Sequence, residues 1–139
     1  MTSPTEYIES RKTALYQYIG TYGMKASDLN TETTSYISAL RLFKGIPIMM
    51  RTTDSLYQMA RQITGITIPV KGEQYDQWHE NVLNYIVRYK QQQKMKTRDI
   101  ANITGMHENN YKKIATRNIT ITGRTLWKYY ENLKKYQQL

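Results

Sequence analysis

The sequence predicts a mostly helical α+β fold that arises from an internal tandem duplication, with a small central antiparallel sheet. Three observations lead to this prediction. Apolar residues recur at the three-, four- and seven-residue steps of amphipathic helices. The same order of elements occurs in residues 1–72 and again in residues 73–139. Short alternating or β-branched runs interrupt the helices, and strands this short are expected to pair across the two copies.

The two copies can be aligned along most of their length. Their first amphipathic segments match at an offset of 67 residues, which places Tyr18 opposite Tyr85. The motif Met-Lys-x-x-Asp-Leu/Ile follows in both copies, from Met24 and from Met95, at an offset of 71 after a four-residue insertion. Any two amphipathic segments can be aligned, but the shared order of elements favours duplication over chance.

Each copy is expected to contain four helices and one strand. The second helix of each copy begins near Ser27 or Thr97, because an aspartate in its first turn favours a helix N-terminus. A further extended run at 66–70 contains Pro69, which confines it to a sheet edge or a strand end. The other expected ranges are 5–21 and 74–92 for the first helix, 33–43 and 107–116 for the third, 46–50 and 119–122 for the strand, and 54–64 and 124–137 for the last helix, with a hinge at 71–73.

The charge of the chain favours a polyanionic partner. The 139 residues include 20 Lys and Arg against 11 Asp and Glu, a formal charge of +9. Residues 73–139 hold twelve basic and six acidic side chains, an excess of +6, against +3 in residues 1–72. Each cation placed on a phosphate releases condensed counterions, so such an excess favours nucleic acid.

Composition also excludes several classes of protein and of site. The chain has no cysteine, which rules out disulfide bonds, thiol catalysis and Cys-ligated metals. Two histidines without clustered carboxylates, and no phosphate-binding loop or nucleophile elbow, predict neither an enzyme nor a bound cofactor or metal. No apolar run approaches the ~20 residues that cross a bilayer, and the N-terminus lacks a secretory pattern, so we expect a cytoplasmic protein without membrane insertion.

Aromatic residues are expected to serve the core. The chain has 13 Tyr and a single Phe. A tyrosine buries its ring and keeps its hydroxyl at a wet edge, which suits a thin core under a polar surface. Trp78 and Trp127 lie on apolar helix faces and are expected in the core rather than as base-stacking platforms.

Residues 97–116 are typical of a helix-turn-helix. Ala101 supplies the small residue where two helices cross, and Gly105, four residues later, tolerates the positive φ of the turn. Thr104 departs from the pattern, because an apolar side chain usually precedes the glycine, and a small rotation that brings in Ile103 is the expected compensation. The expected apolar anchors of both helices are Ile100, Met106, Tyr111 and Ile114.

The outward residues of the third helix suit the major groove of DNA. Asparagine pairs with adenine, lysine with guanine or phosphate, and Glu108 with cytosine unless it only compensates the helix dipole. The segment after this helix resembles a small wing that contacts phosphates. An ordinary solvated helix face is the alternative for the lysine pair. The predicted DNA-binding residues are His107, Glu108, Asn109, Asn110, Lys112, Lys113, Arg117, Asn118 and Arg124.

The first copy is a degenerate version of this motif. Asn30 stands where the second copy has Ala101, and Thr34 where it has Gly105. Its third helix is less basic, so this copy either reads DNA weakly or only completes the core. Its predicted DNA-binding residues are Ser35, Tyr36, Ser38, Arg41 and Lys44.

The duplicated order of elements, the motif at 97–116, the length and the basicity resemble the TraN-like double-stranded-DNA-binding transfer proteins of Gram-positive conjugative plasmids. The resemblance covers nearly the whole chain. It implies an internal dimer, a monomer with pseudo-two-fold symmetry that carries a helix-turn-helix at each end of a central sheet. It also implies binding near the transfer origin or its promoter, as a repressor or as an accessory of the relaxosome or type IV secretion system. Asn30 and Thr34 leave open whether both ends read sequence.

Double-stranded DNA is therefore the expected partner, and two other functions compete with DNA binding. One is a protein-interaction adaptor on a helix-turn-helix scaffold, with Tyr36, Ile37 and Leu42 exposed on the first copy as its docking surface. The other is RNA binding, which ranks low because the chain lacks aromatic RNP-type strands and a GXXG loop.

Overall fold

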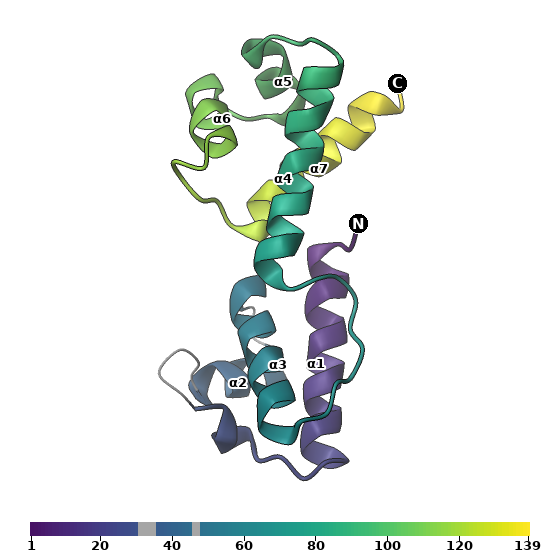
Figure 1. The fold of residues 1–139 in the computed structure, drawn as a ribbon, viewed down its shortest axis with the longest axis vertical. Coiled ribbons are helices and arrows are strands. Elements are labelled where there is room, and N and C mark those ends of the chain that lie inside the picture. The colour runs from purple at the N-terminus through teal and green to yellow at the C-terminus, as the bar shows by residue number, and fades with distance from the viewer. Residues whose placement is uncertain (31–35, 46–47) are drawn as a thin grey trace. The chain divides into compact units, whose positions relative to one another are not determined.

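The chain folds into helices that belong to two compact units. The structure is a computed structural model that describes residues 1–30, 36–45 and 48–139. Contacts divide the chain into unit 1, Met1–Tyr75, and unit 2, Asp76–Leu139. Unit 1 holds α1 (Pro4–Gly20), the 3₁₀ turn η1 (Ala26–Leu29), α2 (Tyr36–Phe43) and α3 (Met50–Thr64); the remaining helices are α4 (Tyr75–Gln92), α5 (Thr97–Thr104), α6 (Glu108–Ala115) and α7 (Gly123–Gln137) (Figure 1).

The prediction of a central antiparallel sheet is wrong. The described residues form helices and loops, and no strand occurs among them. Ile48 and Met49 precede α3 as irregular chain, and Met50 already belongs to that helix, while residues 46–47 lie outside the description. Residues 119–122 are a loop whose last residue, Thr122, caps α7 by accepting a hydrogen bond from the N–H of Thr125. Where they are described, the expected strands are therefore irregular segments that lead into α3 and α7.

The segment 66–70 is irregular, and its backbone is hydrogen-bonded by tyrosine hydroxyls and not by a neighbouring strand. The hydroxyl of Tyr18 donates to the carbonyl of Ile66 at 2.6 Å and accepts from the N–H of Ile68 at 3.1 Å. The hydroxyl of Tyr57 donates to the carbonyl of Ile68 at 2.6 Å. Because backbone groups near a protein interior must be paired, these hydroxyls do what a strand partner would do. The alternation of residue types at 66–70 therefore distinguishes the two sides of an extended segment and does not indicate a sheet.

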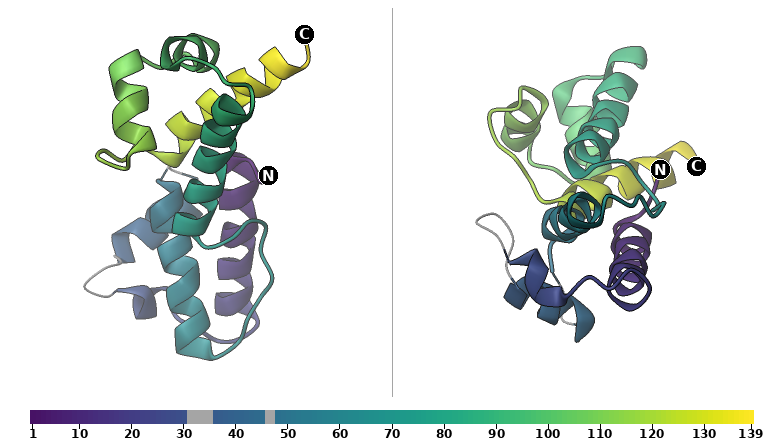
Figure 2. Two further views of the ribbon diagram at one scale, coloured as in Figure 1. Left: turned by 45° about the horizontal axis from the view of Figure 1, so that its top comes forward. Right: turned by 60° about the horizontal axis from the view of Figure 1, so that its bottom comes forward.

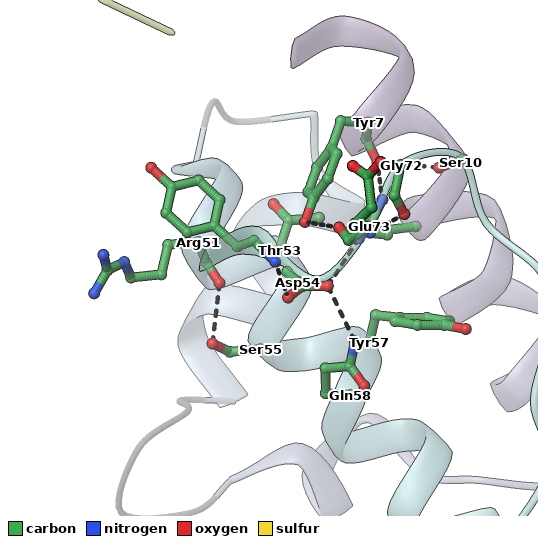
Figure 3. A network of polar contacts seen from close by, with 12 residues as sticks. Tyr7, Ser10, Arg51, Thr53, Asp54, Ser55, Tyr57, Gln58, Gly72 and Glu73 are labelled. Atoms are coloured by element: carbon green, nitrogen blue, oxygen red, sulfur yellow. Dashed lines mark hydrogen bonds and ion pairs between the residues drawn. The ribbon is translucent and has the colours of Figure 1, made fainter. Parts of the chain in front are cut away.

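Arg11 joins α1, α3 and the end of this segment through a buried network. Its side chain is 1% exposed, and its Nε donates to Oδ1 of Asp54 at 3.0 Å. The two terminal nitrogens donate to the carbonyls of Lys71, Gly72 and Glu73 at 2.6–3.1 Å. Tyr7 adds its hydroxyl to the same carbonyl of Glu73, at 2.8 Å, and lies close to Asp54 and Gly72 (Figure 3). The expected hinge at 71–73 is therefore fastened to unit 1 by its carbonyls.

The motif shared by the two copies has the same local geometry in both. Gly23 and Lys94, the residues that precede the two methionines, both have positive φ, at 72° and 52°. The N–H of Met24 then donates back to Tyr18, and that of Met95 to Lys90, which ends the preceding helix. The two lysines that follow are both extended N-caps, and the carbonyl oxygen of each accepts a hydrogen bond from the backbone N–H of the aspartate three residues later. The two segments differ afterwards, where η1 has four residues and α5 has eight.

Unit 2 is organised around aromatic residues where α7 crosses α4 (Figure 2). Trp78 is 1% exposed and stacks on Trp127 with ring centroids 6.1 Å apart. Tyr130 contacts the Trp127 ring at 4.7 Å and the Tyr85 ring at 5.2 Å. Trp78 therefore lies in the core of unit 2, as expected, whereas Trp127 is only half-buried against it. Among the residues described, no helix is long and apolar enough to span a membrane.

Candidate nucleic-acid interface

The turn between α5 and α6 is closed by Gly105. This residue has φ +84° and ends α5 with its N–H on the carbonyl of Ala101 at 2.9 Å, while the N–H of Met106 reaches the same carbonyl at 3.0 Å. A left-handed residue at this position costs a glycine little and an L-residue more. The positive φ that the sequence pattern predicts at Gly105 is confirmed.

The anchors of the two helices are all buried. Tyr111 and Ile114, three residues apart on α6, are 4% and 2% exposed, and this spacing fixes how α6 is rotated about its axis. Burial also raises the pKa of the Tyr111 hydroxyl, so the ring packs as a neutral group. The other buried anchors are Ile100, Ala101 and Met106.

Thr104 takes the place of the usual apolar residue without any rotation of the helix. Its side chain is 0% exposed, and its hydroxyl donates to the carbonyl of Ile100 at 2.8 Å. Its own carbonyl accepts from Nδ2 of Asn132 on α7 at 2.8 Å. The threonine can be buried because its hydroxyl is paired within its own helix, while Ile103, the expected substitute, is half-buried.

The outward face of α6 is polar and exposed. No hydrogen bond or ion pair within the described part of the chain engages the side chains of this face. His107 is an extended N-cap whose side chain makes no capping bond, so the first N–H groups of α6 are open to an external acceptor. The residues of this face are His107, Glu108, Asn109, Asn110, Lys112 and Lys113, all of them exposed as predicted.

The segment after α6 is not a wing, and Arg117 is engaged within the protein. Its Nη2 donates to Oε1 of Glu80 at 2.5 Å and to Oδ1 of Asn84 at 2.8 Å, both on α4. Its Nη1 donates to the carbonyl of Ala115. The same loop is tied to α4 a second time, because Nε2 of His79 lies 2.9 Å from the carbonyl oxygen of Ile121 and must be its donor. Arg117 thus positions the loop behind α6.

Asn118 and Arg124, the other predicted contacts beyond α6, are both exposed. The N–H of Asn118 donates to the carbonyl of Lys113 at 2.8 Å, which continues the end of α6. Arg124 lies in the first turn of α7 and has no ion-pair partner in the described residues.

Several exposed cations near the motif were missed by sequence reasoning. Lys128 lies on α7 one turn after Arg124, and the two line a common groove. Lys94, Lys96 and Arg98 surround the N-terminus of α5, which is the helix that crosses the DNA backbone in helix-turn-helix proteins. The alternating cations of residues 94–98 immediately before and within the first helical turn are the signal that would have found them.

The counterpart in unit 1 is described only in part. Ser35 and the side chains of Tyr36 and Ser38 lie outside the described residues. Arg41 and Lys44 are exposed, as a contact with DNA would require. Leu42, expected to be exposed on a docking surface, is instead 3% exposed, because the apolar face of α2 turns it inward.

Chemical sites of other kinds do not emerge from the described residues. No group of three or more His, Cys, Asp or Glu side chains there is placed to hold a metal ion. Comparison with known proteins gives no further assignment, since no protein-family model, curated protein or solved structure matches the chain.

Proposed function

We propose that this chain is a non-enzymatic, sequence-recognising double-stranded DNA-binding protein whose α6 enters the major groove. One observation carries the proposal. A helix-turn-helix closed by Gly105 has its apolar anchors buried and presents an outward face whose side chains have no partner among the described residues. A polar face with two lysines that form no ion pair with any described residue suits an external polyanion.

The dimensions and side chains of α6 fit this task. With its side chains an α-helix is about 10–12 Å across, which fits the ~12 Å width of the major groove. Asn109 and Asn110 offer the paired donor and acceptor that read adenine, and Lys112 and Lys113 serve guanine or phosphate. The uncapped N-terminus of α6 presents backbone N–H groups that bind phosphate oxygens.

Binding of the duplex backbone is spread over further cations. Arg98 and the lysines at the start of α5 are exposed and suit phosphates of the duplex. In unit 1, Arg41 and Lys44 are exposed cations of the same kind. Arg117 is left out of this set because its guanidinium is already bonded to Glu80 and Asn84. We propose instead that it keeps α6 at a fixed angle to α4.

The role in the cell rests on the resemblance alone. We propose from it that the protein acts near the transfer origin or promoter of a conjugative plasmid, as a repressor or as an accessory of the relaxosome or secretion system. A footprint of the full chain on the DNA around its own gene tests this proposal. A protected site in that region supports it, and uniform cleavage along the whole region contradicts it.

The binding function itself is tested by selection of duplexes from a random library, followed by anisotropy titrations of the selected duplex and a scrambled one. We expect Lys112→Ala to weaken both, and Asn109→Ala to reduce the ratio between them by about 5- to 100-fold, since one bidentate base contact is worth roughly 1–3 kcal/mol. Lys135→Ala, an exposed cation at the far end of α7, is the matched control. If no duplex binds saturably below micromolar concentrations, DNA binding is contradicted and the adaptor function is favoured.

A further inference from the structure

A groove runs beside the helix-turn-helix, between the turn and α7. It measures about 630 Å³, and its wall on α7 contains Arg124 and Lys128. These two cations are four positions apart in the sequence, so they project from the same face of the helix. Both are exposed, and neither has an ion-pair partner among the described residues. The full lining is Thr104, Gly105, Arg124, Thr125, Lys128, Tyr129 and Asn132.

The lining offers donors and no carboxylate. Besides the guanidinium and the ammonium, the hydroxyl of Tyr129 has no intramolecular partner in the described part of the chain. Asn132 uses one amide hydrogen on the carbonyl of Thr104 and has a second to give. Two cations one turn apart repel each other, and a bound anion would relieve that repulsion. The chemistry of the groove therefore matches an oxyanion.

The floor of the groove is held rigid by the same contacts that close the turn. Asn132 clamps the carbonyl of Thr104 from α7, and Thr104 itself is 0% exposed. The backbone of Gly105 lies so near that a Cβ built there would meet Nδ2 of Asn132 at 3.3 Å. A side chain at position 105 would thus intrude on the groove, which a glycine leaves open.

We propose that this groove holds a backbone phosphate of the duplex whose bases α6 reads, an inference that rests on the proposed function. The turn that lines the groove leads into α6 within two residues, because Gly105 is followed by Met106 and then by the N-cap His107. A phosphodiester presents two charged oxygens, which suit one guanidinium and one ammonium. The groove would fix the register of the protein on DNA and carry no sequence information.

The test compares two double variants of the full chain that remove the same charge. Arg124→Gln with Lys128→Gln alters the groove, and Arg88→Gln with Lys135→Gln removes two exposed cations that do not line it. We expect the groove variant to bind the selected and the scrambled duplex at least about tenfold more weakly, by equal factors. The slope of log affinity against log salt should also fall by about 1 to 2, as lost phosphate contacts require.

The outcomes separate this inference from the proposed function. If the groove variant matches its control while Lys112→Ala still weakens binding, the groove holds no phosphate and the helix-turn-helix still binds DNA. If the wild-type chain binds no duplex, the proposed function fails and the groove assignment fails with it. Inorganic phosphate is titrated in parallel, with the side-chain amide of Asn132 followed by NMR. A shift with phosphate in a protein that ignores the duplex would assign the groove to a free anion and overturn the proposal.

Discussion

The geometry of the turn predicts a defined loss of stability for Gly105→Ala. An L-residue in the left-handed region costs roughly 1–2 kcal/mol, and Gly105 has φ +84°. The new Cβ would also press on Nδ2 of Asn132 at 3.3 Å and weaken its bond to the carbonyl of Thr104, which adds about 1 kcal/mol. The smaller entropy of the unfolded variant offsets roughly 0.4–1 kcal/mol. The free energy of unfolding is therefore expected to fall by about 2 kcal/mol.

Tryptophan fluorescence measures this loss in unit 2 alone. Both tryptophans of the chain, Trp78 and Trp127, lie in that unit. A small domain has a urea dependence of about 1 kcal/mol per molar, so the midpoint of unfolding should fall by about 2 M. Gly105→Asn should recover part of the loss, because asparagine tolerates positive φ better than alanine.

Gly65→Ala is the matched control. Gly65 ends α3 with φ +67°, and a Cβ there would meet nothing within 4 Å. This variant has the same backbone strain without the steric contact. The strain lies in unit 1, so the unfolding midpoint measured by tryptophan fluorescence should not change. An unchanged midpoint for Gly105→Ala would refute the left-handed turn and with it the helix-turn-helix.

Three further predictions concern the buried network of unit 1 and the loop behind α6. Arg11→Met leaves the carboxylate of Asp54 buried without its cation, and should lower the unfolding free energy by about 3–5 kcal/mol, measured from tyrosine circular dichroism in urea; a loss under 1 kcal/mol would contradict the network. Burial raises the pKa of the Tyr7 hydroxyl, so the unfolded chain loses this proton near pH 10 while the folded chain keeps it. The free energy of unfolding should therefore be unaffected by this group below about pH 10 and fall by about 1.4 kcal/mol per pH unit above it. Tyr7→Phe should remove this contribution to the slope of stability against pH. A slope identical to that of the wild type would contradict the burial of the Tyr7 hydroxyl. Arg117→Ala should lower the stability of unit 2 by about 1 kcal/mol and weaken duplex binding without changing its salt slope, because Arg117 bonds Glu80 and Asn84; a slope reduced by about 1 would return it to the phosphate contacts.

The helices and the turn could be predicted from the sequence because their causes are local. Apolar spacing marks the buried face of each helix, and Gly105 with Ala101 four residues before it marks the crossing and the turn. The rotation of α6 also follows from the sequence, since Tyr111 and Ile114 are its apolar residues on one face. The exposed set on α6 is what remains when these anchors are removed.

The sequence led to a wrong prediction of a sheet because the alternation of apolar and polar residues indicates an extended segment. It does not indicate which groups pair with the backbone of that segment. At 66–70 the partners are the hydroxyls of Tyr18 and Tyr57, from α1 and α3. The excess of tyrosine over phenylalanine was the only signal of this arrangement in the composition. At 119–122 the polar residue Thr122 was a helix cap rather than the end of a strand.

The engagement of Arg117 and the groove depend on contacts between residues far apart in the chain. Arg117 bonds Glu80, 37 residues earlier, and nothing near Arg117 in the sequence announces this pairing. The groove needs α7 to lie against the turn, which Asn132 achieves through the carbonyl of Thr104, 28 residues away. Single-sequence reasoning found the cation Arg124 and missed its companion Lys128 for this reason.

The most direct test of the central claim is an NMR titration of the ¹⁵N-labelled full chain with the selected duplex, in which backbone amide shifts are mapped along the sequence. If α6 enters the major groove, the largest shifts occur at its exposed residues, from Glu108 to Lys113, with others at Arg124 and Lys128. Shifts that saturate elsewhere in the chain and leave α6 unchanged would contradict this placement of α6.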